Sequence, residues 1–218
     1  MLEEGREYYE SARRRVAMVR GAMKSATASP SIRYLDDLAQ LKCGPDMLAL
    51  KLFPNAKEVT ESFGAYSAAA RYMRRDLPLS DRSVTMVAVG DGRTPRTAAT
   101  FAYRSAWKCY SVDPMLKANW HHSHGVDRLT CLPIMAEQVE PIRCEQAVVV
   151  AVHSHASLPA AVRTVRPSSG VVNVIAMPCC VEQWLDGCEP DVVYADPSVW
   201  SPQCTVMVWR GVESAWKD

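Results

Sequence analysis

The sequence predicts an α/β protein: a doubly wound, mostly parallel seven-stranded sheet with an antiparallel last strand, preceded by a helical N-terminal segment. From Val84 onward, short valine-rich runs alternate with helical stretches, which is typical of parallel strands joined by crossover helices. The last connection is too short for a crossover. The first eighty residues have helical periodicity instead. We therefore expect a helical extension over residues 1–80 and a sheet domain over residues 81–218.

Composition places the chain among ordinary globular proteins. Its 218 residues are 48% hydrophobic and 22% charged, which excludes disordered, collagen-like and coiled-coil classes. The longest wholly apolar run, Ala147–Val152, is far shorter than the roughly 18 residues of a membrane span. The net charge of +1 excludes a globally basic protein that wraps nucleic acid. Residues 1–82 hold 14 basic and 11 acidic side chains, so this segment alone is basic enough to be compatible with a nucleic-acid partner.

The cysteines and the N-terminal residues indicate the cellular compartment of the protein. None of the eight cysteines belongs to a CxxC pair, so we expect reduced thiols and no zinc ribbon. The stretch Met1–Arg15 holds four glutamates and lacks an apolar centre, unlike a secretory signal or a transit peptide. These features predict an intracellular, cytoplasmic protein.

Prolines and glycines divide the N-terminal segment into helices. Breaks fall at Pro30, at Gly44 and Pro45, and at Pro54, and Pro78 ends the segment. Helices are expected over Glu4–Ala26, Ile32–Leu41, Asp46–Phe53 and Lys57–Arg75.

The second part of the chain supplies the strands. Strands are expected over Val84–Val89, Lys108–Val112, Arg128–Leu132, Gln146–Val152, Val171–Ala176, Asp191–Ala195 and Cys204–Arg210. Helices are expected over Pro95–Ala106, Pro114–His122, Leu158–Val165 and Val181–Asp186. Pro197 and Pro202 interrupt the link between the last two strands, so these strands form a hairpin and the final strand is antiparallel.

The strongest local motif follows the first strand. Gly90 and Gly92 let a ligand approach the backbone, and Thr94 can cap a helix that begins at Pro95. Asp113 ends the second strand, where a carboxylate can accept both ribose hydroxyls of an adenosine ligand. A tight turn with a capping aspartate explains the same pattern without a ligand. Because Pro95 replaces the third glycine of a dinucleotide fingerprint, a cofactor without phosphate, S-adenosylmethionine, fits better than a diphosphate.

With these motifs, residues 84–210 resemble the class I, seven-strand S-adenosylmethionine-dependent methyltransferases, a Rossmann-like methyltransferase fold. The resemblance implies a doubly wound sheet, an antiparallel seventh strand and cofactor contacts from residues that follow the first four strands. The residues implied are Val89, Gly90, Asp91, Gly92, Thr94, Asp113, Pro114, Met135, Ala136 and His153. Two features depart from the family: Ala88 stands where an acidic residue is common, and the Asn/Asp-Pro-Pro-Tyr motif is missing after strand four.

Candidate catalytic residues follow strands four and five. His153 and His155 stand two apart at the carboxyl edge of the sheet, where one of them could act as general base on a hydroxyl or amine. Cys179 follows strand five and is a candidate nucleophile or a packing residue of the pocket. His121, His122 and His124 precede strand three and belong to the opposite edge, so we expect no metal site.

The arginines of the N-terminal segment suggest a partner. Arg13, Arg14, Arg74 and Arg75 could contact RNA phosphates if their helices pack side by side, and a solvated helical face is the other interpretation. The sequence thus leaves two hypotheses open. One is an S-adenosylmethionine-dependent methyltransferase, with RNA as the leading substrate. The other is a catalytically inactive methyltransferase-like scaffold in a larger, ribonucleoprotein-type assembly.

Overall fold

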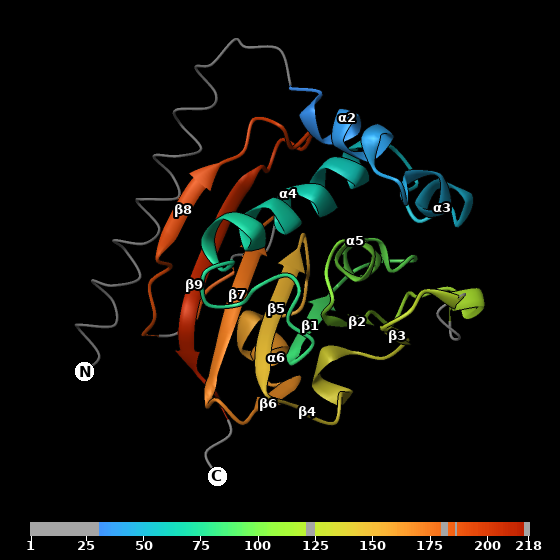
Figure 1. Ribbon diagram of the computed structural model, residues 1–218. Helices are drawn as coiled ribbons and strands as arrows, with labels where there is room; N and C mark the ends of the chain where they lie inside the picture. The colour runs from blue at the N-terminus through green and yellow to red at the C-terminus, as the bar shows by residue number, and fades with distance from the viewer. Residues whose placement is uncertain (1–30, 121–124, 180–182, 186, 216–218) are drawn as a thin grey trace.

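A computed structural model describes residues 31–120, 125–179, 183–185 and 187–215 of the chain. Seven strands form its central sheet (Figure 1): β1 (Val84–Val89), β2 (Lys108–Val112), β3 (Leu129–Leu132), β5 (Gln146–Val152), β7 (Val171–Met177), β8 (Val192–Ala195) and β9 (Thr205–Glu213). Their order across the sheet is β3-β2-β1-β5-β7-β9-β8.

The pairing confirms the predicted fold class. Strands β1, β2, β3, β5 and β7 run parallel, and β9 pairs antiparallel with both β7 and β8. Numbered along the chain, the order is 3-2-1-4-5-7-6. This is the doubly wound order 3-2-1-4-5-6 with the last strand inserted antiparallel beside the fifth. The hairpin predicted between the last two strands is therefore confirmed.

Side chains of each strand alternate between two hydrophobic cores. In β5, Val148, Val150 and Val152 belong to one core, whereas Ala147 and Val149 belong to the other. This period of two, with buried residues on both faces, is why the strands are continuous apolar runs. Helices α2 (Arg33–Gln40), α3 (Gly44–Ala49), α4 (Ala56–Tyr72) and α5 (Arg96–Arg104) lie on the face of the first core. The helix α6 (Leu158–Val162) and the 3-10 turn η3 (Ala136–Gln138) lie on the other face.

The helix α4 belongs to the layer that covers the sheet. It begins directly after the cap residue Asn55, whose side chain accepts a 3.1 Å hydrogen bond from the Glu58 amide. It crosses β5 and β7 beside α5 (Figure 1), and its Tyr66 ring lies 5.3 Å from that of Phe101 in α5. Phe63 of α4 is fully buried in the same core. The helices before residue 80 and the sheet that follows it therefore share one hydrophobic core.

Several predicted elements differ from the structure. The predicted helix Pro114–His122 is wrong over its described part, which holds only the 3-10 turn η1 (Ala118–Trp120). The amides here have other acceptors: Met115 donates to the Asp113 carboxylate at 2.7 Å, and Lys117 donates to the Arg93 carbonyl at 3.1 Å. The helix predicted to reach Val165 ends at Val162, because residues 165–167 form a strand instead.

That strand belongs to a second, smaller sheet that the sequence analysis missed. The strand β6 (Val165–Pro167) pairs in parallel with β4 (Ile142–Cys144). The predicted helix Glu4–Ala26 lies outside the described residues, and so does most of Val181–Asp186. Within the latter, Leu185 forms an isolated antiparallel bridge with Cys188. No helix in the described part of the chain is long and apolar enough to span a membrane.

Candidate functional site

The candidate site lies at the carboxyl edge of the sheet, where β1 and β5 are neighbours. From β1 the chain proceeds outward through β2 to β3, and it then returns to place β5 on the other side of β1. This reversal of strand order opens a crevice at the strand ends, the usual ligand site of open α/β sheets. The loops that follow β1, β2 and β5 all reach this crevice.

A pocket of about 440 Å³ occupies the crevice. Nine predicted residues line it: Val89, Gly90, Gly92, Asp113, Pro114, Met135, Ala136, His153 and His155. Six further residues line it: Arg96, Val112, Met115, Glu137, Ser154 and Ala156. The volume suits a cofactor-sized ligand.

The two glycines of the first loop are required by the backbone. Gly90 has a φ of +74° and Gly92 a φ of +84°, a region that side chains with a Cβ atom rarely adopt. Gly90 also packs closely against the other loop, because a Cβ atom there would lie 2.8 Å from the Ser154 Cα atom. At Gly92 a Cβ atom would meet the Arg96 guanidinium at 2.5 Å.

Asp91 has a structural role. Its side chain is buried, and its carboxylate accepts hydrogen bonds from the Thr97 amide at 2.8 Å and the Ala98 amide at 3.1 Å. It also accepts a 2.9 Å hydrogen bond from the Ser111 hydroxyl of β2. Asp91 is therefore the residue that satisfies the first amides of α5, and it is absent from the lining of the pocket.

The predicted cap at Thr94 is wrong. The helix α5 begins at Arg96 with Pro95 as its cap residue, and the Thr94 hydroxyl donates instead to the Leu52 carbonyl at 2.6 Å. Thr94 is buried and does not line the pocket. Its hydrogen bond ties the loop after β1 to the helical segment.

Asp113 links the loops after β1 and β2. Its Oδ2 atom accepts a 2.8 Å hydrogen bond from the Gly92 amide, and its Oδ1 atom accepts the bond from Met115. The residue is 9% exposed and lines the pocket. Because each carboxylate oxygen can accept two hydrogen bonds, both still have capacity for a ligand hydroxyl.

The loop after β5 places His153 against helix α4. Its Nε2 atom lies 2.9 Å from Oε1 of Glu61, and Lys57 Nζ approaches the same oxygen at 2.8 Å. Burial acts to raise the pKa of Glu61. The close contact and charge of His153, followed by those of Lys57, outweigh it and hold the pKa at about 2. Glu61 therefore carries a negative charge next to the imidazole.

Arg96 brings a cation to the pocket. Its Nε atom lies 2.5 Å from Oε2 of Glu58, and its Nη1 atom donates to the Asp91 carbonyl. Burial raises the pKa of Glu58 against the opposing charge of Arg96. The sequence motif gave no sign of this arginine, because its partner Glu58 comes from α4.

The remaining candidates divide between the pocket and its surroundings. His155 lines the pocket, whereas Cys179 does not. The Cys179 thiol donates a 3.6 Å hydrogen bond to the His153 carbonyl. No group of three or more His, Cys, Asp or Glu side chains within the described residues could hold a metal ion. His121, His122 and His124 lie outside those residues.

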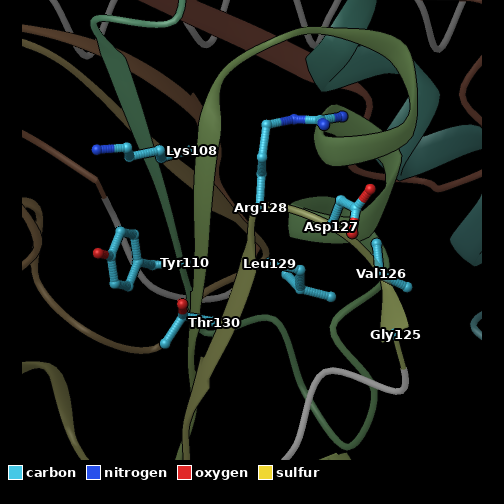
Figure 2. Close-up of a pocket in the computed structure, with 8 residues that line it drawn as sticks. All are labelled: Lys108, Tyr110, Gly125, Val126, Asp127, Arg128, Leu129 and Thr130. Atoms are coloured by element: carbon cyan, nitrogen blue, oxygen red, sulfur yellow. The ribbon is translucent and has the colours of Figure 1, made fainter.

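A second pocket, of about 450 Å³, lies away from this edge (Figure 2). Gly125–Arg128 precede β3 and line it together with Lys108, the first residue of β2. Figure 2 shows the Lys108 and Tyr110 side chains beside the ribbon of β2. This pocket is at the amino ends of its strands, the edge opposite the crevice, so we place the candidate site at the first pocket.

Comparisons with known proteins give matches among solved structures alone. Neither models of known protein families nor curated protein sequences match this chain. Among solved structures, the chain is similar to a mutant of MtNAS in complex with S-adenosylmethionine, with 10% identity, a TM-score of 0.48, and coverage of 81% of this chain and 69% of that one. It is also similar to the Burkholderia thailandensis 1,6-didemethyltoxoflavin-N1-methyltransferase, with 16% identity, a TM-score of 0.35 and coverage of 84% and 74%.

A third similar structure is provisionally assigned as a Methanococcus maripaludis S-adenosyl-L-methionine-dependent methyltransferase. Its identity is 15% and its TM-score 0.37, and the alignment covers 54% of this chain and 55% of that one. Because all three TM-scores lie below 0.5, we base the functional conclusion on the strand order and the pocket of this chain. The strand order is the one that the sequence resemblance implies: a doubly wound sheet with an antiparallel seventh strand.

Proposed function

We propose that this protein is an S-adenosylmethionine-dependent methyltransferase whose cofactor binds in the crevice between β1 and β5. The observation that carries the proposal is the pocket at the point where the strand order reverses. It combines two glycines with positive φ, a carboxylate at the end of β2 and apolar side chains after β3.

The hydrogen bonds that Asp91 accepts favour this cofactor over a dinucleotide. In dinucleotide-binding proteins, a diphosphate accepts hydrogen bonds at the N-terminus of the first crossover helix. Here the Asp91 carboxylate already accepts from the Thr97 and Ala98 amides of that helix. It uses donors that a diphosphate needs, and its negative charge would repel one. S-adenosylmethionine carries no phosphate and does not need those amides.

The lining residues fit the parts of the cofactor. Asp113 would accept hydrogen bonds from the ribose hydroxyls, and Met135 and Ala136 would flank the adenine. Arg96 would attract the carboxylate of the methionyl part. Ala88 stands in the first strand where the family commonly has an acidic residue. Its side chain is packed in the first core. When bound, the cofactor would supply an electrophilic methyl group.

The residues that remain at the pocket suit transfer to an acceptor that must lose a proton. His153 and His155 both line the pocket, and an imidazole can take a proton from a hydroxyl or amine near neutral pH. A packing role suits Cys179 better than a role as covalent nucleophile. Its thiol donates to the His153 carbonyl and stands outside the pocket lining.

RNA remains the proposed acceptor class. Arg74 and Arg75 are exposed just after α4, while Arg13 and Arg14 lie outside the described residues. If all four contact phosphates, the logarithm of RNA affinity should fall with the logarithm of salt at a slope of about −2.8 for a single strand. Reversing Arg74 and Arg75 to glutamate should flatten the slope and leave cofactor binding unchanged. An RNA affinity that is indifferent to salt and to charge reversal would remove RNA as a partner.

Titration calorimetry with two ligands tests the proposed function. We expect heat of binding with S-adenosylmethionine and none with NAD at the same concentration. Tight binding of NAD would overturn the choice of cofactor. If neither ligand binds, the scaffold hypothesis, a methyltransferase-like protein without activity, replaces the enzyme.

A further inference from the structure

We infer that Glu61 of helix α4 is a positioning residue that holds His153 as the general base of the acceptor site. This inference rests on the proposed function and names a residue outside the sheet domain as part of its machinery. The base would then be a pair assembled from the helical segment and the sheet.

The geometry of the pair supports the assignment. Glu61 is fully buried, and its Oε1 atom lies 2.9 Å from Nε2 of His153. The His153 side chain is 13% exposed and lines the pocket, so one edge of the ring contacts α4 while the residue still borders the ligand space. In the tautomer that carries its proton on Nε2, beside the carboxylate, Nδ1 keeps a lone pair that can accept another proton.

Among the described residues, four acidic side chains are buried: Glu61, Asp91, Asp113 and Asp196. Each of the three aspartates accepts a hydrogen bond from at least one backbone amide, as expected of a structural carboxylate. The partners of Glu61 are instead the side chains of Lys57 and His153. A buried charge is costly, and an apolar residue would cover the sheet at lower cost. The acid is therefore best explained by what it does to the imidazole.

The backbone of His153 gives a second, independent observation. His153 has a φ of +50°, an uncommon conformation for a residue other than glycine. Its amide donates to the Met177 carbonyl at 2.9 Å, and its own carbonyl accepts from the Cys179 thiol. Both backbone groups are thus held while the conformation directs the ring toward Glu61. Such local strain is common where a functional side chain must be aimed.

The charges around the pair leave Glu61 available to His153. On α4, Lys57 shares the Glu61 oxygen and is 44% exposed, so solvent weakens its charge. Glu58 is paired with Arg96 of α5 at 2.5 Å and also lies beside Glu61, whose charge adds to the rise in the pKa of Glu58. On the loop after β5, His155 is the other titratable side chain beside the pocket.

The proposed reaction forms one bond, breaks one bond and moves one proton. The acceptor atom, an oxygen or nitrogen that carries a proton, forms a bond to the methyl carbon. The bond from that carbon to sulfur breaks, and its electron pair stays on sulfur, which becomes neutral. Nδ1 of His153 takes the proton of the acceptor, and Glu61 stabilises the imidazolium until the proton passes to water.

The test measures the titration of the His153 ring by NMR in the full-length protein and its variants. We expect Glu61→Gln to lower the midpoint of the His153 titration, because a carboxylate at this distance favours the imidazolium. Glu58→Gln is the matched control from the same helix, and it should move the midpoint much less. Lys57→Met should move it the opposite way, since Glu61 would no longer be shared.

Lys57→Met also keeps the inference testable if Glu61→Gln does not fold, because the Lys57 side chain is 44% exposed and its replacement leaves the core intact. A His153 midpoint that is the same in Glu61→Gln and the parent protein, or unmoved in Lys57→Met, would overturn the inference. Turnover should fall more in Glu61→Gln than in Glu58→Gln. Glu61→Asp should recover part of the turnover that Glu61→Gln loses. If S-adenosylmethionine does not bind the parent protein while the midpoint still shifts, the pair stands and the proposed function fails.

Discussion

The Asp113 carboxylate accepts a 2.8 Å hydrogen bond from the Gly92 amide, which fixes the loop after β1 to the end of β2. Two sides of the candidate pocket are therefore held by one side chain. The same carboxylate is the group that we expect to contact the ribose, so it combines a structural role with a binding role.

Replacing Asp113 separates these roles. We expect Asp113→Ala to weaken S-adenosylmethionine binding by at least tenfold, because hydrogen bonds to a charged group contribute roughly 1.5–3 kcal/mol. It should also lower the free energy of unfolding, since the Gly92 and Met115 amides lose their acceptor. Asp113→Asn keeps one oxygen acceptor and should lie between the parent and Ala. Calorimetry and urea denaturation measure the two effects, and unchanged affinity in Asp113→Ala would place the ribose elsewhere.

Gly90 tests the close contact between the first loop and the loop after β5. We expect Gly90→Ala to destabilise the fold more than Gly170→Ala, although both positions have a φ near +74°. The strain of that conformation costs roughly 1–2 kcal/mol for alanine at either site. At Gly170 nothing lies within 4 Å of an added Cβ, whereas at Gly90 it would press on Ser154. Equal losses in urea denaturation would mean that the two loops do not meet.

The structure changes the expected effect of Gly92→Val. From the sequence alone, a branched side chain at this position is expected to project into the cofactor space. A Cβ atom there would instead meet the Arg96 guanidinium at 2.5 Å, in a backbone conformation unfavourable to valine. The loss of cofactor binding would then come with a loss of stability.

Asp91 provides the test of a purely structural aspartate. We expect Asp91→Ala to lower the free energy of unfolding by about 2 kcal/mol or more, because a helix cap is removed and the buried Ser111 hydroxyl loses its acceptor. Where the variant is still folded, its S-adenosylmethionine affinity should stay within a fewfold of the parent. A selective loss of affinity without a loss of stability would return Asp91 to the cofactor site.

The charge of Glu61 predicts a dependence of stability on pH. Its pKa in the folded protein is about 2, lowered from 4.5, so its contribution is present above about pH 4.5 and is lost as the pH falls toward 2. The difference in unfolding free energy between the parent and Glu61→Gln should shrink over this interval by about 3 kcal/mol at most. Urea denaturation at stepwise lower pH measures it. A difference that stays constant across the interval would show that Glu61 is not held in its charged form.

The sequence predicted the sheet well because each central strand can be recognised from its own residues. Residues 84–89, 108–112 and 146–152 form strands with the predicted bounds, since buried parallel strands are short apolar runs. The strands β4 and β6 were missed because three residues carry no detectable period. The predicted helix after Pro114 failed because its amides bind acceptors from neighbouring loops.

The candidate site was predictable where a lining residue directly follows a strand, as with Gly90, Asp113 and His153. The roles of Asp91 and Glu61 were not predictable. Asp91 occupies the glycine loop, yet only the position of α5 shows that its carboxylate faces the helix. Glu61 belongs to a helix far along the chain from His153, and no spacing rule links them.

The position of S-adenosylmethionine on the protein tests the central claim most directly. We expect a titration followed by amide NMR to shift the signals of Gly90, Gly92 and Met115, which surround the pocket at the ends of β1 and β2. The amides of residues 125–130 at the second pocket should not respond. Shifts confined to residues 125–130, or no saturable shift at millimolar cofactor, would contradict a cofactor site between β1 and β5.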